Sequence, residues 1–223
     1  MSFNVAIDGP AGAGKSTVAK AVAAKRNFIY VDTGAMYRTM ALYFLRKGVD
    51  KNDEAAVNKA CMEVSISIAY ENGAQQVFLN GENVSGLIRT EEVGNMASAT
   101  SGYLFVRKKL VELQKEMARK SDVVMDGRDI GTVVLPQAGV KIFLTAAPEA
   151  RARRRTLELH QRGQDADFDE ILREIRRRDE QDENRPVAPL RQAEDAVLLD
   201  TTNLDLKGSL EALLTLVRER LAL

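Results

Sequence analysis

The sequence has few of the residues on which several common chemistries depend. Its 223 residues include one cysteine, Cys61, one histidine, His160, and no tryptophan. A single cysteine excludes an internal disulfide and a cysteine-rich zinc site, and Cys61 is interpreted as a small buried apolar residue. A single histidine excludes multi-histidine metal sites and argues against Ser/His/Asp and Cys/His hydrolase arrangements. We therefore expect chemistry that needs no imidazole, or only that of His160.

The sequence also lacks an excess of charge and any long apolar run. Lys plus Arg and Asp plus Glu each total 32, so no net field favours nucleic acid or an anionic membrane as partner. No segment approaches about 18 consecutive apolar residues, and the first residues, MSFN, do not resemble a signal peptide. We expect a cytoplasmic protein without nucleic-acid or membrane partners, and the balanced charge favours a monomer.

Apolar runs that alternate with helical periodicity predict an α/β protein. The predicted strands are residues 3–7, 28–31, 123–125, 140–144 and 196–200. The predicted helices are residues 16–25, 35–47, 53–62, 90–98, 103–120, one from Pro148, one from the capping box at 167–170, and 206–220. Buried strands separated by helices indicate a three-layer fold with a five-stranded parallel sheet and helices on both faces.

One stretch interrupts this pattern. Residues 64–70 alternate in period two, and the turn pairs Asn72-Gly73 and Asn80-Gly81 flank an apolar run at 77–79. Such pairs are typical of two-residue hairpin turns. We predict a small antiparallel insert here.

A glycine-rich loop lies between the first predicted strand and helix. Residues 9–16, GPAGAGKS, match the pattern G-x-x-x-x-G-K-[ST]. In this pattern the backbone N–H groups bind phosphates, Lys15 reaches the β and γ phosphates, and the Ser16 hydroxyl is a ligand of Mg²⁺. A nucleoside triphosphate with Mg²⁺ is thus the predicted first substrate. The guanine signature N-K-x-D is missing, since residues 58–61 read NKAC, which argues against a GTPase.

Arginines at loop and helix ends are candidates for phosphate recognition, because a guanidinium binds phosphate through two hydrogen bonds. These candidates are Arg38, Arg107, Arg128, Arg178 and Arg185. Arg128 follows a buried strand directly, where open α/β sheets bind ligands. Asp126, at the end of that strand, is placed to hold Mg²⁺ through water.

Eleven arginines lie between Arg151 and Arg191, interleaved with acidic residues. Arg151, Arg153, Arg154 and Arg155 crowd the start of one helix, before a predicted loop at 160–164. The alternatives are a solvated helix surface and a mobile lid that brings cations to a transferring phosphoryl group. We favour the lid, with Arg154 and Arg155 as its candidate catalytic residues.

Motifs along nearly the whole chain resemble those of bacterial-type cytidylate kinases, of the nucleoside monophosphate kinase superfamily. The matching stretches are IDGPAGAGKST, VDTGAMYR, NGENVSGLIRTEEV, MDGRDIGTVVLP, KIFLTA and RRRDEQDENRPVAPL. The resemblance implies transfer of the ATP γ-phosphoryl group to CMP or dCMP. It implies one kinase chain over 1–223, with a core (1–32, 100–147, 190–223), a monophosphate-binding lobe containing the insert (33–99) and a lid (148–189).

The resemblance also implies roles for individual residues. The ATP site comprises Gly9, Pro10, Ala11, Gly12, Ala13, Gly14, Lys15, Ser16 and Thr17. Arg38 and Arg128 would hold the acceptor phosphate, with Lys15 and Arg128 as catalytic residues. Ser98, Arg107 and Asp129 would face cytosine, and Arg178, Asp182 and Arg185 would lie around the ribose and base. Thr33 matches an acceptor-site position that holds Ser or Thr in the family; compared with Ser it keeps the hydroxyl and adds a methyl group.

The single histidine is consistent with such a kinase. The attacking atom is an ionised phosphate oxygen, so no general base is required. Two alternatives remain: a kinase for another acceptor such as UMP, AMP or a polyol, and a nucleotide-sensing module that hydrolyses ATP slowly and acts through a partner.

Overall fold

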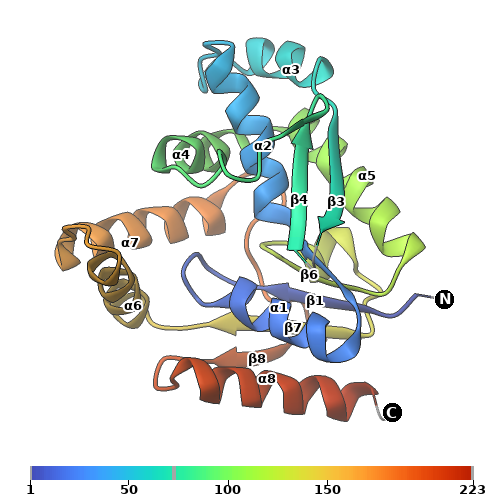
Figure 1. The fold of residues 1–223 in the computed structure, drawn as a ribbon, viewed down its shortest axis with the longest axis vertical. Helices are drawn as coiled ribbons and strands as arrows, with labels where there is room; N and C mark the ends of the chain where they lie inside the picture. The colour runs from blue at the N-terminus through green and yellow to red at the C-terminus, as the bar shows by residue number, and fades with distance from the viewer. Residues whose placement is uncertain (1, 72–73, 222–223) are drawn as a thin grey trace. The chain divides into compact units, whose positions relative to one another are not determined.

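The computed structural model describes residues 2–71 and 74–221 (Figure 1). In chain order the elements are β1 (Asn4–Asp8), α1 (Lys15–Arg26), β2 (Ile29–Asp32), α2 (Thr33–Arg46), α3 (Glu54–Met62), β3 (Ile66–Glu71), β4 (Ala74–Leu79), β5 (Glu82–Asn83), α4 (Glu91–Thr100), α5 (Leu104–Lys120), β6 (Val123–Gly127), the π-helical turn η1 (Ile130–Val134), β7 (Val140–Thr145), α6 (Pro148–Gln161), α7 (Phe168–Asn184), β8 (Val197–Asp200) and α8 (Leu206–Leu221). The chain forms two compact units, Met1–Tyr30 with Ser121–Leu223 (the first unit) and Val31–Lys120 (the second unit).

The main sheet has five strands in the order β2-β6-β1-β7-β8. β1 runs parallel to β6 and β7, and β7 runs parallel to β8. The predicted parallel five-stranded α/β architecture is therefore confirmed. All of β6 is buried, as is β1 after its first residue, which accounts for the apolar runs at residues 5–7 and 123–125.

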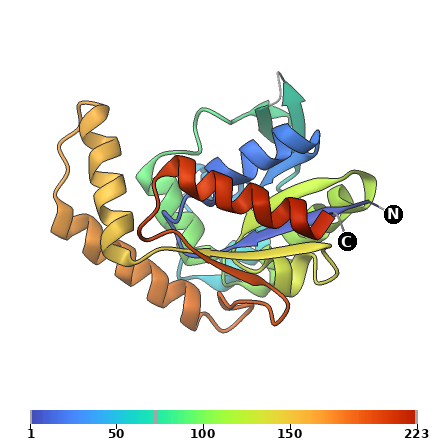
Figure 2. The same ribbon diagram turned by 90° about the horizontal axis from the view of Figure 1, so that it is seen from below.

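Helices α1 and α8 form the core of the first unit with this sheet. Val18 and Val22 of α1 and Leu213 and Val217 of α8 are fully buried in one cluster with residues of β1, β6 and β7. Figure 2 shows α8 lying along the strands. The glycine loop thus begins on a buried strand and ends on a helix that packs in the core, which limits its movement.

The second unit contains the predicted antiparallel insert. β4 pairs antiparallel with β3, from Ile66↔Leu79 to Glu71↔Ala74, and with β5. Asn80 and Gly81 both have positive φ and join paired Leu79 and Glu82, as a type I′ turn requires. The other predicted turn, Asn72-Gly73, lies outside the described residues.

Helix starts follow the predicted capping chemistry with small changes of boundary. The Asp167 carboxylate caps α7 by accepting from Glu170 N at 2.7 Å, and Pro148 is the first residue of α6. α2 begins at Thr33, two residues before the prediction, because Asp32 accepts from Ala35 N at 2.9 Å. The predicted loop at 160–164 is shorter, since α6 continues through Gln161. In the described ranges, no helix has both the length and the apolar composition needed to cross a bilayer.

Candidate functional site

The glycine-rich loop joins β1 to α1 and needs glycine at specific positions. A Cβ atom on Gly9 would lie 1.9 Å from the backbone oxygen of Leu144 in β7, which no side chain allows. Gly14, the residue before α1, has φ +89° and offers no capping side chain. No N-cap side chain therefore occupies the first N–H groups of α1. These groups can bind an anion, which the helix dipole also favours.

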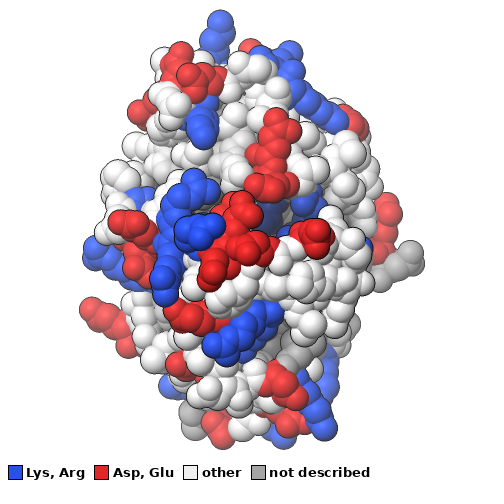
Figure 3. All heavy atoms as spheres, turned by 90° about the vertical axis from the view of Figure 1, so that its left-hand side faces the viewer, with Lys and Arg blue, Asp and Glu red and all other residues white. Residues whose placement is uncertain are grey.

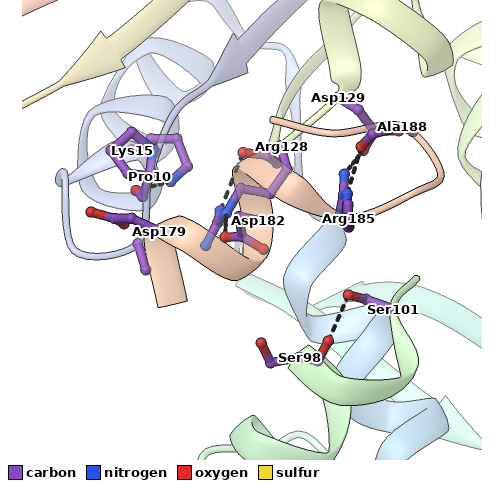
Figure 4. Close-up of polar contacts among 12 residues, drawn as sticks. Pro10, Lys15, Ser98, Ser101, Arg128, Asp129, Asp179, Asp182, Arg185 and Ala188 are labelled. Atoms are coloured by element: carbon purple, nitrogen blue, oxygen red, sulfur yellow. Dashed lines mark hydrogen bonds and ion pairs between the residues drawn. The ribbon is translucent and has the colours of Figure 1, made fainter. Parts of the chain in front are cut away.

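Lys15 lies at the start of α1 and is buried. Its Nζ donates to the backbone oxygen of Pro10 at 2.7 Å, which holds the ammonium inside the loop (Figure 4). Burial, together with the nearby charge of Arg128, lowers the pKa of Lys15 to about 7, although Asp126 and other nearby carboxylates oppose the shift. A phosphate bound in the loop would supply negative charge and stabilise the protonated ammonium.

Ser16 and Asp126 are brought together, as the sequence predicts. The Ser16 hydroxyl donates to Asp126 Oδ2 at 2.9 Å, and the Tyr30 hydroxyl donates to Asp126 Oδ1 at 2.8 Å. Mg²⁺ prefers such oxygen ligands and is usually bound by one or two carboxylates together with substrate phosphates and water. Within the described residues there is no group of three His, Cys, Asp or Glu residues that could hold a metal. The pair fits an ion shared with a nucleotide rather than an all-protein metal site.

Asp8 is a residue that the sequence analysis did not single out. Its two carboxylate oxygens accept from Ile130 N at 2.8 Å and from Gly131 N at 2.7 Å. These contacts attach η1 to the last residue before the glycine loop. Burial is the main reason that the pKa of Asp8 is raised to about 6, although the two backbone hydrogen bonds oppose the shift. A carboxylate at the end of a buried strand was the available signal, the same one that identified Asp126.

In the first unit, two arginine–aspartate pairs connect the residues just after β6 to the C-terminal end of α7 and the residue after it. Arg128 Nε donates to Asp182 Oδ2 at 2.7 Å, and Arg185 Nη2 lies 3.4 Å from Asp129 Oδ1 (Figure 4). Burial opposes the charge on Asp182, but Arg128, with smaller contributions from Arg178 and Arg185, lowers the pKa of Asp182 below its usual value. The structure therefore brings together five predicted residues from two segments about 50 positions apart.

The arginines of the predicted lid have different environments. Arg154 Nη2 donates to the backbone oxygens of Thr201 and Leu204, at 2.5 and 3.0 Å. Arg155 is exposed and pairs with Glu158 on the same helix. The buried arginine of this cluster is Arg151, which contacts the glycine loop and was not among the predicted catalytic residues. Figure 3 shows acidic and basic side chains interleaved on the face that it presents, without a large patch of one sign.

In the second unit, the N-terminus of α2 carries two predicted residues. Thr33 is buried at the first position of the helix. A Cβ atom on Gly34 would lie 3.2 Å from Asp32 Oδ1 and 3.3 Å from Arg38 Nη1, so Arg38 lies over Gly34 near Asp32. Burial would raise the pKa of Asp32, but Arg89, whose Nη2 donates at 2.6 Å, and Arg38 together lower it.

Ser98 and Arg107, in the second unit, are both hydrogen-bonded to Ser101. The Ser98 backbone oxygen accepts from the Ser101 hydroxyl at 2.9 Å, and the Ser101 backbone oxygen accepts from Arg107 Nη1 at 3.3 Å. The guanidinium of buried Arg107 also lies 5.9 Å from the centre of the Tyr37 ring. Tyr37 was missed by the sequence analysis, although it stands beside Arg38 in the motif VDTGAMYR.

Comparison with known proteins identifies relatives over nearly the whole chain. A family model described as "Cytidylate kinase" matches residues 5–219. The chain is 46% identical to the cytidylate kinase of Shouchella clausii, over 97% of this chain and 96% of that protein. It is 48% identical to the cytidylate kinase of Caldicellulosiruptor bescii, over 96% and 95% of the two chains. A solved shikimate kinase from Bacteroides thetaiotaomicron has a similar fold, with a TM-score of 0.51, 17% identity and 99% of each chain covered.

Proposed function

Because the chain belongs to the cytidylate kinase family, we propose that it transfers the γ-phosphoryl group of ATP to CMP or dCMP. The products are ADP and CDP or dCDP. The observation that carries the proposal is the glycine loop with buried Lys15, in the same unit as the arginine and aspartate residues that follow β6. The loop and Lys15 can bind the phosphates of the donor, and the arginines of the cluster after β6 can bind a second anion.

We assign ATP to the loop residues 9–17. Lys15 contacts the β and γ phosphates. Their negative charge raises the pKa of Lys15 from about 7, so that its ammonium is fully protonated beside them. Ser16 and Asp126, whose side-chain oxygens are in contact, would hold Mg²⁺, Ser16 as a ligand and Asp126 through water. When bound, the ion would neutralise charge on the phosphates.

We propose roles toward the acceptor residue by residue, each on the chemistry of its own side chain. Arg38 and Arg128 bind the CMP phosphate as bidentate donors. Polar groups recognise the base and sugar, because cytosine offers both donors and acceptors at its edge. They are Thr33, Ser98 and Arg107 in the second unit, and Asp129, Arg178, Asp182 and Arg185 in the first.

The reaction requires orientation and charge neutralisation rather than a base. An ionised oxygen of the CMP phosphate attacks the γ phosphorus, a new P–O bond forms, and the bond from the γ phosphorus to the β–γ bridging oxygen breaks, so ADP leaves with that electron pair. Lys15 and Arg128 offset the negative charge at the junction. Residues 148–189 act as a lid, in which Arg154 and Arg155 reach the phosphoryl group after leaving Thr201 and Glu158.

We further propose that the protein works as a monomer in the cytoplasm on small nucleotides, with neither nucleic acid nor membrane as partner. The equal totals of basic and acidic residues support the absence of nucleic-acid and anionic-membrane partners, because the chain has no net attraction for a polyanion.

The test is a coupled assay of ADP formation with Mg-ATP and CMP, dCMP, UMP, AMP, GMP or no acceptor. We expect turnover with CMP and dCMP that greatly exceeds turnover with AMP or GMP. Equal or reversed rates would refute the acceptor assignment, and ATP hydrolysis without an acceptor would favour the nucleotide-sensing module. Activity with another acceptor alone would leave the ATP site intact and remove the proposed roles of Ser98, Arg107 and Asp129.

A further inference from the structure

Arg151 is a buried cation whose hydrogen bonds connect three segments of the first unit. Only 3% of its surface is exposed. Nε donates to the backbone oxygen of Ala146, the residue after β7, at 2.8 Å. Nη1 donates to the backbone oxygen of Ala11, within the glycine loop, at 2.9 Å. Nη1 and Nη2 also bind the two carboxylate oxygens of Asp179 in α7, at 3.0 and 2.5 Å.

The contact with Ala11 determines how one peptide group of the loop is turned. In a trans peptide the C=O and the following N–H point in opposite directions. Because Arg151 holds the Ala11 oxygen on its own side, the N–H of Gly12 points away from Arg151. The stem of Arg151 also lies against Gly12, since a Cβ atom there would be 3.6 Å from the Arg151 Cβ atom. Both contacts restrict rotation of the Ala11–Gly12 peptide.

Asp179 keeps the guanidinium in this position. A buried arginine requires a counter-ion, and the two-point contact fixes the plane of the guanidinium as well as its charge. Asp179 lies on α7, which packs against α6. The direction of a loop N–H group therefore depends on an ion pair between two helices of the proposed lid.

We propose that Arg151 is a positioning residue for ATP, and that the Arg151–Asp179 pair transmits the packing of α6 against α7 to the phosphate-binding loop. The inference rests on the proposed function, because it assigns the loop to ATP. Arg151 acts through the Ala11–Gly12 peptide and touches no reacting atom. Losing it weakens ATP binding and leaves CMP binding unchanged.

Replacing both Arg151 and Asp179 separates an effect on ATP positioning from an effect on the stability of the fold. Replacing a buried ion pair by apolar residues of similar volume often preserves or increases stability, whereas removing one partner is destabilising. The double variant Arg151→Met with Asp179→Leu therefore keeps the helices packed but leaves the Ala11 oxygen without its donor. Arg151→Lys is the second variant, because it keeps the charge but has no planar fork to bind Asp179 and Ala11 together.

The chain supplies a matched control. Arg176 and Glu149 also join α7 to α6, at 2.6 Å, but they are exposed and 60% and 40% of their side-chain surfaces reach solvent. No hydrogen bond of either side chain to the loop is found among the described residues. The control variant Arg176→Met with Glu149→Gln thus removes a link between the same helices without touching the Ala11–Gly12 peptide.

The experiment measures the Kd of the Mg²⁺ complex of a non-hydrolysable ATP analogue, the KM values for ATP and CMP, and the thermal midpoint for each variant. We expect the Kd and the ATP KM to rise about tenfold in Arg151→Lys and in the apolar double variant, from loss of a charge-assisted hydrogen bond. The CMP KM and the values of the control variant should stay within about twofold of the parent.

An analogue Kd within about twofold of the parent in a folded Arg151→Lys variant would overturn the inference. So would equal rises in the KM values for ATP and CMP, or the same loss of ATP binding in the control. If the double variant does not fold, Arg151→Lys decides. Because the analogue Kd requires no phosphoryl transfer, it tests the inference even if the parent chain fails to phosphorylate CMP, which would refute only the proposed acceptor.

Discussion

The glycine loop and the cluster after β6 bind charge in two different ways. The loop, residues 9–16, is one continuous segment, and its backbone offers N–H groups beside one buried lysine. The cluster consists of side chains, with Arg128 and Asp129 held by Asp182 and Arg185 from about 50 residues later. Backbone groups in a contiguous segment are positioned by local conformation, whereas paired side chains depend on long-range packing.

This difference predicts which functions are sensitive to which changes. In the loop, most of the binding capacity lies in backbone groups, and Lys15 supplies the one side-chain cation. In the cluster, every residue is both a candidate ligand and a partner that orients another ligand. We therefore expect a sharp loss of turnover from one position of the loop and graded losses of acceptor affinity across the cluster.

The largest expected effect is that of Lys15→Ala. It removes the only ammonium placed inside the loop among the described residues, so kcat should fall at least about 100-fold while the far-UV spectrum and thermal midpoint show a folded protein. Lys20→Ala is the control, because Lys20 lies on the same helix and is exposed. Unchanged turnover in a folded Lys15→Ala protein would refute the phosphate-loop assignment.

A smaller and more selective effect is expected of Arg128→Ala. Loss of a bidentate cation should raise the KM for CMP by about 10- to 100-fold, and the KM for ATP by much less. Steady-state kinetics with each substrate varied in turn measure the two constants. Arg162→Ala, at an exposed arginine paired with Glu158, serves as control and should change neither value. A larger rise for ATP than for CMP would place Arg128 at the donor instead.

Stability, rather than activity, is expected to respond at Asp8, the link between the two regions. Its pKa is raised from 3.8 to about 6, so between these values the folded protein binds more protons than the unfolded chain. The contribution of Asp8 to the free energy of unfolding is therefore largest below pH 4 and falls, by up to about 3 kcal/mol, as pH rises through 6. The charge of Asp129 also raises the pKa of Asp8, whereas the charge of Lys15 lowers it.

Urea unfolding between pH 4 and 7.5 tests this, with Asp8→Asn as the variant that cannot ionise. The stability of the parent relative to Asp8→Asn should decrease as pH rises through this range. Parallel pH profiles for the two proteins would contradict the raised pKa.

Much of the fold and part of the site could be predicted from local patterns. The five parallel strands, the caps at Pro148 and Asp167 and the hairpin turn at Asn80-Gly81 depend on residues within a few positions of one another. The helical boundary at Thr33 was misplaced by two residues because capping by Asp32 was overlooked. The pairing of Ser16 with Asp126 was predictable, because carboxyl ends of neighbouring parallel strands meet at one sheet edge.

The sequence by itself determined the nucleotide loop, because glycine conformations, the helix N-terminus and Lys15 all lie within eight consecutive residues. It did not determine which arginine of residues 151–155 would contact that loop, since these side chains have nearly the same local sequence. Only tertiary structure decided this, because α6 packs with Arg151 facing Ala11 and Asp179, turns Arg154 toward Thr201 and leaves Arg155 in solvent. The burial of a long charged side chain depends on partners distant in the sequence, which local patterns do not specify.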